Sequence, residues 1–448
     1  MTTLLWFWVL LFVALLALVV RRGQRGGTLV LAYFAGLSLI HVPGVLIYTG
    51  TAPNLADGLV TGTGFIATLV GLSTFVVGAW CASLRVVKWV ANPVTLPLDY
   101  RRVGKVMLLL GVGVYFFALP VLSLIPSATA IVSSAGGLLP MGLWFWLYAA
   151  HITHDRRRFM LGLAMLPLLP LSTMIDGGFI GFGVYWVIAI AAFVYCIVPR
   201  KRLFFLLAPV ILGFGLSFAV AYFGERNALR ESVWIQQAGI FDRLSRVSQM
   251  GERFEWLDLG NPDHVAPLNE RLNQNILVGQ AIERREIGLT EPAYGDTVPL
   301  WIFIPRAIWP EKPAVGGSGD IVSHYTGQNF AVGTSVGVGQ PLEFYINFGW
   351  PGIAAGFALL GYVLMRLDIA LFQAFRRCDV YGVLRNGLPG LALLQPGGSL
   401  MEILIAGIGA LIAAPLIARL LKKTGWLEKG RARGHDTERF AELRRWNQ

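Results

Sequence analysis

Apolar runs of membrane-spanning length recur along this chain and are separated by short polar segments. Each run is close to the ~20 residues that an α-helix needs to cross the hydrocarbon core of a bilayer. The pattern therefore predicts an all-α polytopic membrane protein with about eleven transmembrane helices. The runs lie roughly at residues 3–20, 28–48, 61–82, 105–125, 136–153, 159–175, 180–198, 203–222, 342–364, 379–395 and 401–420.

Basic residues cluster in alternate loops between these runs, for example at Arg21–Arg25, Arg156–Arg158 and Arg200–Arg202. Because cytoplasmic loops of membrane proteins are enriched in Lys and Arg, this alternation predicts an N-terminus outside and a C-terminus in the cytoplasm. The first run is followed by its basic residues, whereas a signal peptide is preceded by them. We therefore expect a retained first helix.

One polar segment is far longer than the others and divides the chain. Residues 223–341 form a predicted extracytoplasmic loop domain between N-terminal membrane helices at 1–222 and C-terminal membrane helices at 342–420. A basic cytoplasmic tail at 421–448 follows. The loop domain holds 10 Lys and Arg and 14 Asp and Glu, so the net charge of +11 comes from the remaining short loops and the tail. Such scattered charge indicates membrane topology and not a nucleic-acid-binding surface.

Composition excludes a soluble protein and several kinds of site. The chain is 55% hydrophobic and 14% charged, against about 25% charged residues in soluble domains. Its three cysteines are far apart and lack metal or redox spacing, so we expect small buried side chains and no disulfide framework. The chain contains no Asp-x-Asp pair. We therefore expect neither a metal nor another cofactor.

The loop domain has two parts with different patterns. In the first, Leu268, Leu272 and Ala281 share one helical face, which predicts amphipathic helices lying over the membrane-embedded part. The second, from Thr290 to Gln340, is rich in Pro and Gly. A long irregular segment of this kind is usually functional.

This second part contains the strongest candidates for anion binding. Arg306 and Lys312 lie six residues apart among prolines and tryptophans, with Trp309 between them. A guanidinium fork and an ammonium group on a stiff turn are suited to holding a diphosphate. The alternative is that both side chains extend to lipid headgroups.

Further candidates follow along the chain. His324, beside Tyr325, is either a proton carrier or a structural histidine. Glu343 stands at the start of a membrane run, where an acid either works on a ligand or pairs with an arginine. Arg385 lies inside the tenth run and is expected to face a polar cavity or an anion.

Three runs of sequence resemble the bacterial polysaccharide repeat-unit polymerases of the O-antigen polymerase type. They are RLNQNILVGQAIE, IPRAIWPEKP and GTSVGVGQPLEFYINFGWPG. The motifs cover roughly residues 265–355, and the expected topology covers the whole chain. The resemblance implies a metal-independent glycosyltransferase of the GT-C type in the bacterial inner membrane, with its active site on the periplasmic side.

The resemblance also implies a reaction and residue roles. A growing glycan would pass from undecaprenyl diphosphate to a new lipid-linked repeat unit, building O-antigen, capsule or exopolysaccharide. Arg306, Lys312 and Arg271 match basic positions of the motifs and would hold the diphosphate, with Arg385 as a further anion ligand. The acid–aromatic element supplies Glu343, Tyr345 and Asn347. The chain-length regulator and the flippase would be protein partners.

Several roles stay open on the sequence alone. Glu343 and His324 are both candidates for the base that accepts the acceptor's proton. Tyr325, Tyr345, Asn347 and Trp309 are candidates for positioning the substrate. An O-antigen ligase, which passes glycan to lipid A core, shares the topology class. A lipid-linked sugar transporter or flippase is the alternative from a different class, although such proteins usually show paired repeats.

Overall fold

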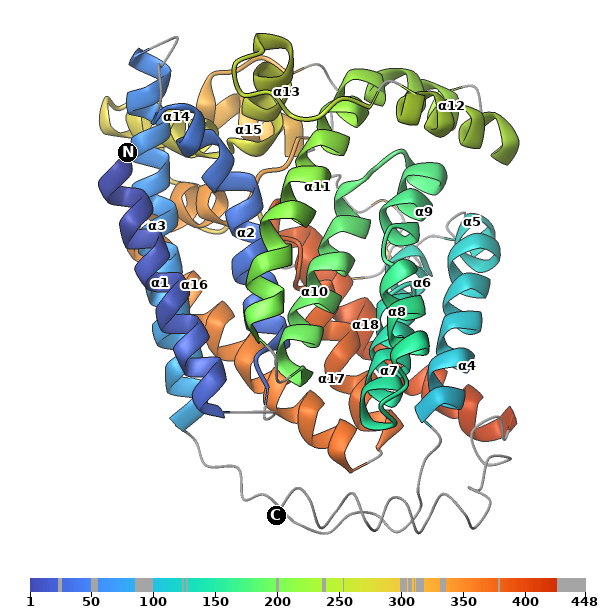
Figure 1. Ribbon diagram of the computed structural model, residues 1–448. Helices are drawn as coiled ribbons and strands as arrows, with labels where there is room; N and C mark the ends of the chain where they lie inside the picture. The colour runs from blue at the N-terminus through green and yellow to red at the C-terminus, as the bar shows by residue number, and fades with distance from the viewer. Residues whose placement is uncertain are drawn as a thin grey trace.

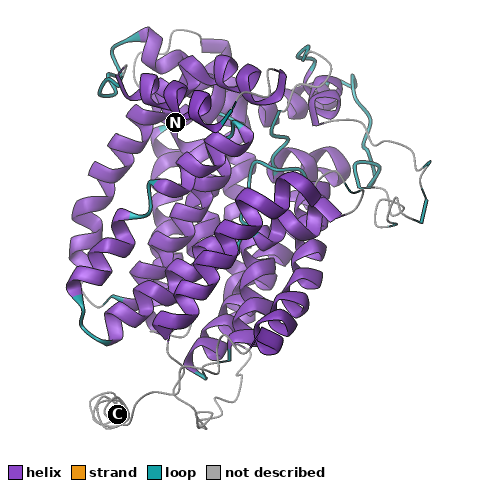
Figure 2. Ribbon diagram, turned by 90° about the vertical axis from the view of Figure 1, so that its right-hand side faces the viewer, coloured by secondary structure: helices purple, strands orange, loops and turns teal. Residues whose placement is uncertain are grey.

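The structure, a computed structural model, is helical throughout its described part. Figure 2 shows helices and loops and no strand among these residues. The described residues are 1–22, 26–49, 55–84, 100–122, 125, 128–198, 201–235, 239–252, 254–298, 304, 308–309, 311, 318–330, 336–377 and 379–424.

Nine helical segments of the described chain are long and apolar enough to cross a membrane. The prediction of a polytopic α-helical membrane protein is therefore confirmed, but its count of about eleven spans is not. Two of the expected spans contain shorter helices, α10 (Gly181–Ile197) and α17 (Val380–Ala392). The nine segments are Thr2–Arg21, Thr28–Ile47, Ala56–Leu84, Tyr100–Leu122, Ala128–Ile152, Arg156–Ile175, Phe204–Val233, Gln340–Arg376 and Leu400–Thr424.

Three of these segments are broken where Pro or Gly interrupts helical hydrogen bonding. A π turn at Val114–Ala118 precedes Pro120, which lacks the N–H for a helical bond. Gly136 and Gly137 separate the next pair of helices. The third break lies just before Pro167 and Leu168. The pairs are α4 (Tyr100–Gly113) and α5 (Leu119–Leu122), α6 (Ala128–Ala135) and α7 (Leu138–Ile152), and α8 (Arg156–Ala164) and α9 (Leu168–Gly177).

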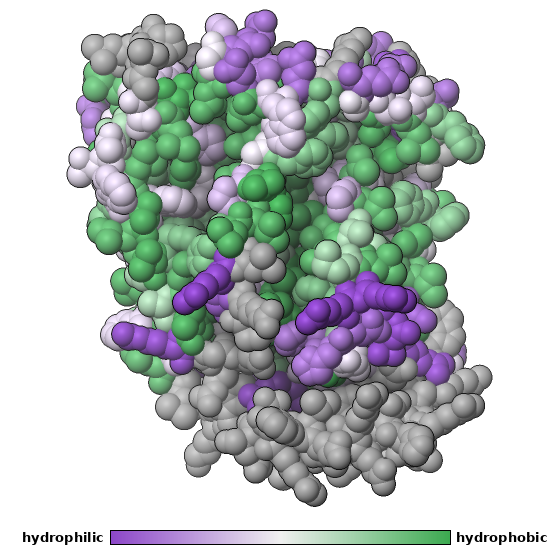
Figure 3. All heavy atoms as spheres, in the orientation of Figure 1, coloured by the Kyte–Doolittle hydropathy of each residue, from purple (hydrophilic) through white to green (hydrophobic). Residues whose placement is uncertain are grey.

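Four further helices lie at one end of the bundle. We call them the surface helices: α12 (Ile240–Glu252), α13 (Pro262–Leu272), α14 (Asn275–Glu286) and α15 (Ser318–Thr326). Figure 1 shows them beyond the tops of the spans, on the same side as the N-terminus. The other end, which we call the basic end, carries the helix ends at Arg21, Arg101, Arg156, Arg376 and Lys422. Figure 3 shows apolar residues over the middle of this face and hydrophilic residues toward both ends.

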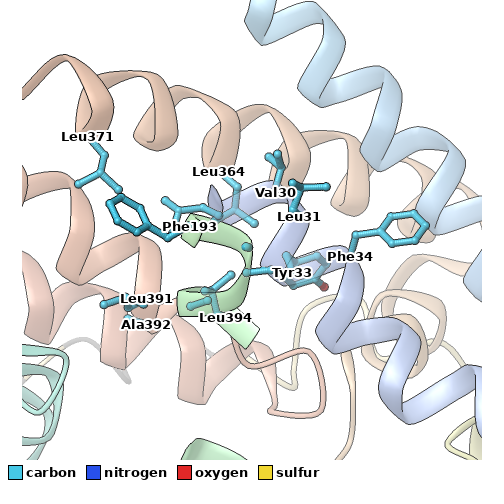
Figure 4. Close-up of a cluster of buried hydrophobic side chains, with 14 of the residues drawn as sticks. Val30, Leu31, Tyr33, Phe34, Phe193, Leu364, Leu371, Leu391, Ala392 and Leu394 are labelled. Atoms are coloured by element: carbon cyan, nitrogen blue, oxygen red, sulfur yellow. The ribbon is translucent and has the colours of Figure 1, made fainter. Parts of the chain in front are cut away.

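The centre of the bundle is formed where α2 (Thr28–Ile47), α10, α16 (Gln340–Arg376) and α17 meet. Figure 4 shows Tyr33 of α2, Phe193 of α10, Leu364 of α16 and Leu391 of α17 in one cluster, with Phe34 of α2 on the side away from Phe193. These five side chains are at most 5% exposed. Buried aromatic and branched side chains of this kind fix the relative positions of the helices that line the site.

A buried carboxylate ties α16 to the start of α2. Asp368, which is fully buried, accepts backbone hydrogen bonds from Leu29 at 2.8 Å and from Val30 at 3.3 Å. The first N–H groups of a helix have no partner within the helix, and the helix dipole favours a negative charge there. Asp368 therefore fixes the basic end of α2 to α16 across 339 residues of sequence.

Helix α3 (Leu55–Leu84) packs closely against α16 through glycines. A Cβ atom added at Gly361 would lie 2.1 Å from the backbone oxygen of Phe75, and one at Gly78 would lie 2.0 Å from that of Ala358. Contacts this short cannot be relieved by rotating a side chain. Small residues let helix backbones approach in membrane proteins, and here they set the distance between the two helices.

We expect Gly361→Ala to lower the free energy of unfolding by ~1–3 kcal/mol, because the two backbones must separate to admit one methyl group. The matched control is Gly407→Ala in α18 (Leu400–Thr424), where an added Cβ has no atom within 4 Å. Alanine there should be neutral or slightly stabilising. Both midpoints can be measured by thermal unfolding of the purified protein in detergent. Equal midpoints for the two variants would contradict the close packing.

Candidate functional site

A large apolar cavity runs along α10 and α11 (Lys201–Arg230). Its volume is about 2780 Å³, several times the roughly 300–1000 Å³ that holds a drug-sized molecule. Residues of α2, α9, α13, α17 and α18 complete the wall. A cavity of this size and character suits a long apolar chain.

Helix α11 forms one wall of this cavity. Its lining residues extend from Lys201 and Phe204 near the basic end to Arg226 and Arg230 near the surface helices. The segment Phe204–Val233 is also the least buried of the nine spans. Only 6% of its 18-residue apolar stretch is buried inside the structure. The cavity therefore extends over most of the membrane depth beside a peripheral helix.

Three arginines lie together in the cavity wall at the surface-helix end. Arg226 and Arg230 lie one helical turn apart on α11, and Arg271 comes from α13. The charge of Arg271 acts on both of the others, and Arg226 acts on Arg230. Like charges that act on one another repel, and a bound anion would reduce that repulsion.

Neighbouring side chains position this arginine group. The Tyr222 hydroxyl donates to the backbone oxygen of Gly178 at 2.8 Å and interacts with the guanidinium groups of Arg226 and Arg230. The Arg230 guanidinium lies 4.3 Å from the centre of the Phe179 ring, a cation–π distance. Arg271 pairs with Glu270 at 2.6 Å.

Asparagines at the turn between α13 and α14 hold Arg271 in place. Gln274 donates its backbone N–H to the Ile40 oxygen of α2 at 3.0 Å. Asn273 donates to the Thr61 hydroxyl of α3 at 3.1 Å, and Asn275 donates to the His41 oxygen at 2.7 Å. Buried polar groups that are satisfied in this way specify one arrangement. The turn between the two surface helices is thus bonded directly into α2 and α3.

The sequence prediction for this turn is confirmed in part. Leu268, Leu272 and Ala281 are buried as the periodicity predicts. The helical face is shared by two helices, however, because α13 ends at Leu272 and α14 begins at Asn275. Helix α13 contacts α2 and α11, and α14 contacts α3 and α16, at this end of the bundle.

The predicted diphosphate ligands have different outcomes. Arg271 lines the cavity with Arg226 and Arg230. Arg306 and Lys312 lie outside the described residues. Arg385 is exposed in a separate cavity of about 340 Å³ with Arg377 and other residues of the turn between α16 and α17. That turn lies at the basic end, so the structure does not bring Arg385 and Arg271 together.

Glu343, Tyr345 and Asn347 are buried near the start of α16 and do not line the large cavity. Glu343 accepts the Leu400 backbone N–H at 2.6 Å. Asn347 accepts the Gly295 N–H at 2.7 Å and donates to the Thr297 hydroxyl at 2.8 Å. These bonds join α16 to α18 and to the segment before α15.

Tyr345 takes part in the same packing. Its backbone oxygen accepts a hydrogen bond from Arg285 at 2.8 Å, and that guanidinium lies 5.3 Å from the Tyr345 ring centre. The acid–aromatic element therefore holds the surface helices on the bundle. Its predicted contact with substrate stays a prediction.

The remaining predicted residues lie on the surface helices or near them. His324 of α15 is exposed and packs edge-on against the Tyr325 ring. Burial raises the pKa of the Tyr325 hydroxyl, and the charge of Asp296 raises it further, whereas Arg285 opposes the shift. Trp309 is 40% exposed. These three residues do not line the large cavity.

Arg226 and Arg230 lie beyond the span expected at residues 203–222, although the sequence carries a signal for them. The predicted span ended at residue 222, but α11 continues to Arg230. Two arginines one turn apart follow the apolar run directly, at the end predicted to lie outside. Cationic residues at that end run against the positive-inside rule and therefore indicate a ligand.

The complete site combines a long apolar cavity with a cationic group at one end. It is suited to an amphiphile that carries an anionic head and an extended hydrocarbon chain. Comparison of the chain with protein-family models, curated proteins and solved structures gives no match. The functional proposal therefore depends on the chemistry of this site and on the motifs in the sequence.

Proposed function

We propose that this protein is a membrane glycosyltransferase that polymerises lipid-linked oligosaccharide repeat units. The observation that carries the proposal is the group of Arg226, Arg230 and Arg271 at one end of the 2780 Å³ apolar cavity. A prenyl diphosphate has the matching chemistry, with an anionic diphosphate and a long apolar chain. The sequence resemblance supports the same class of substrate.

The arginine group would assist the bond-breaking step. When the glycan leaves its carrier, negative charge develops on the diphosphate oxygen that was bonded to the sugar. Prepositioned cations stabilise such charge most strongly where water is scarce. Guanidinium groups also bind phosphate oxygens in pairs, which fixes the orientation of the leaving group. In this proposal Arg306 and Lys312 would add to the arginine group from the loop that follows α14.

The cavity would hold the carrier lipid. Its walls are made mainly of apolar side chains of α10 and α11, such as Val187, Leu207 and Ile211. Because α11 is peripheral, a hydrocarbon chain can reach the cavity from the bilayer without first crossing water. The active site would then lie at the surface-helix end, which the charge pattern predicts to be periplasmic.

The direct test is transfer by the purified protein in liposomes that contain undecaprenyl-diphosphate-linked repeat units as the sole glycan. We expect a ladder of lipid-linked products that differ by one repeat unit, together with released undecaprenyl diphosphate. The products can be separated by gel electrophoresis and identified by mass spectrometry.

Three other results would contradict the proposal. A protein that joins glycan only when lipid A core is supplied would be a ligase. Movement of the labelled repeat unit across the liposome membrane without a change in mass would indicate a transporter. If the protein neither transferred nor moved the repeat unit, this substrate class would be excluded.

A further inference from the structure

The arginine-lined cavity contains one acidic side chain among its described lining residues, Glu402 of α18. This residue is exposed to the cavity, one turn from the start of its helix. A carboxylate in an otherwise apolar and cationic cavity costs free energy unless it is stabilised or works on a ligand. The proposed function so far gives Glu402 no role.

The backbone N–H of Ser399 holds the Glu402 carboxylate, as one half of a reciprocal pair of hydrogen bonds. Its Oε2 atom accepts the backbone N–H of Ser399 at 3.0 Å, and the Ser399 hydroxyl accepts the N–H of Glu402 at 3.2 Å. This arrangement is a capping box at the start of α18. It accounts for one of the two carboxylate oxygens.

A continuous stretch of the cavity wall connects Glu402 with the arginine group. A Cβ atom added at Gly398 would lie 3.2 Å from Glu402 Oε2, and one added at Gly397 would lie 3.2 Å from Gln274 Nε2. Gln274 in turn follows Arg271 by three residues, and both line the cavity. Glycine at 397 and 398 leaves the space into which these polar side chains extend.

The other carboxylate near this helix start has a different environment. Glu343 is fully buried, accepts the Leu400 N–H, and is close enough to feel the charge of Glu402. It does not line the cavity. Of the two neighbouring acids, Glu343 is therefore enclosed by protein and Glu402 is the one that a ligand in the cavity can reach.

We propose that Glu402 is the base that accepts the proton of the acceptor hydroxyl, an assignment that rests on the proposed function. The acceptor oxygen forms a bond to the anomeric carbon of the donor glycan. The bond from that carbon to the diphosphate oxygen breaks, and its electron pair leaves with the lipid diphosphate. The hydroxyl proton passes to the Glu402 carboxylate, and the arginine group holds the diphosphate anion.

The test compares Glu402→Gln with Ser399→Ala in the liposome transfer assay. Glutamine still completes a capping box, so Glu402→Gln removes the base and keeps the helix start. We expect kcat to fall ~100–10,000-fold, the range contributed by general base catalysis, with KM for the lipid-linked substrate unchanged. Ser399→Ala weakens the capping box and keeps the carboxylate. It should lower Tm and leave kcat within a few fold of wild type.

A second variant separates catalysis from structure. In Glu402→Ala, formate added to the assay should restore part of the lost kcat, because a small carboxylate can enter the space that the side chain leaves. Restoration would not occur if the loss came from a distorted helix start. A wild-type kcat in Glu402→Gln would overturn the assignment. A loss of kcat in Glu343→Gln without a loss in Glu402→Gln would overturn it as well. Absence of transfer in the wild-type protein would instead overturn the proposed function.

Discussion

Replacing Arg226 and Arg230 together by alanine is expected to weaken binding of a prenyl diphosphate by a factor of ~100–10,000. A hydrogen bond to a charged group contributes roughly 1.5–3 kcal/mol, and this variant removes the two guanidinium groups of α11 from the wall. Arg271 remains and is paired with Glu270 at 2.6 Å. Affinity can be measured by titrating a fluorescent prenyl diphosphate into the protein in nanodiscs.

Two controls test whether the loss of affinity comes from these guanidinium groups. Arg226→Lys with Arg230→Lys keeps both charges but removes the planar forks, so we expect an intermediate loss of affinity. Arg246→Ala removes a basic residue of α12 that does not line the cavity, and its affinity should equal that of wild type. Wild-type affinity in the double alanine variant would show that the diphosphate binds elsewhere.

The helical membrane class could be predicted from sequence because apolar runs of bilayer length are a local signal. Helix breaks were harder to place. For example, the tenth run was expected to span residues 379–395, whereas α17 ends at Ala392. The following segment bonds to the start of α16, where the Gln340 side chain donates to the backbone oxygens of Gln395 and Gly398. These two hydrogen bonds join residues that are separated by 55 and 58 positions in the sequence, so no local pattern predicts them.

For a similar reason, only some of the residues that line the cavity could be found from the sequence. The motifs identified Arg271, but the length expected for a span placed the helix end before Arg226 and Arg230. The sequence identifies Glu343 as an acid at a membrane boundary, where a carboxylate costs free energy unless it has a partner. Among the described residues, the backbone N–H of Leu400 donates a hydrogen bond to it. A sequence shows that a polar group needs a partner, but the fold decides which partner it finds.

The second large effect expected concerns the apolar part of the cavity. Ala191 of α10 and Ala208 of α11 both line it, and each lies within about three turns of the connection between the two helices. Replacing both by tryptophan adds two bulky side chains at a similar depth. We expect transfer from the undecaprenyl carrier to fall at least tenfold, because a long chain can no longer extend past this point.

The same variant should still use a substrate whose prenyl chain is too short to reach the two tryptophans. Rates with long-chain and short-chain carriers, measured side by side, therefore separate a blocked cavity from a damaged active site. The matched control is Leu206→Trp, since Leu206 is 72% exposed and does not line the cavity. An equal loss with both carriers would mean that the chain does not occupy this cavity. Preference for the short carrier would place the hydrocarbon chain between α10 and α11, with its diphosphate at the arginine group.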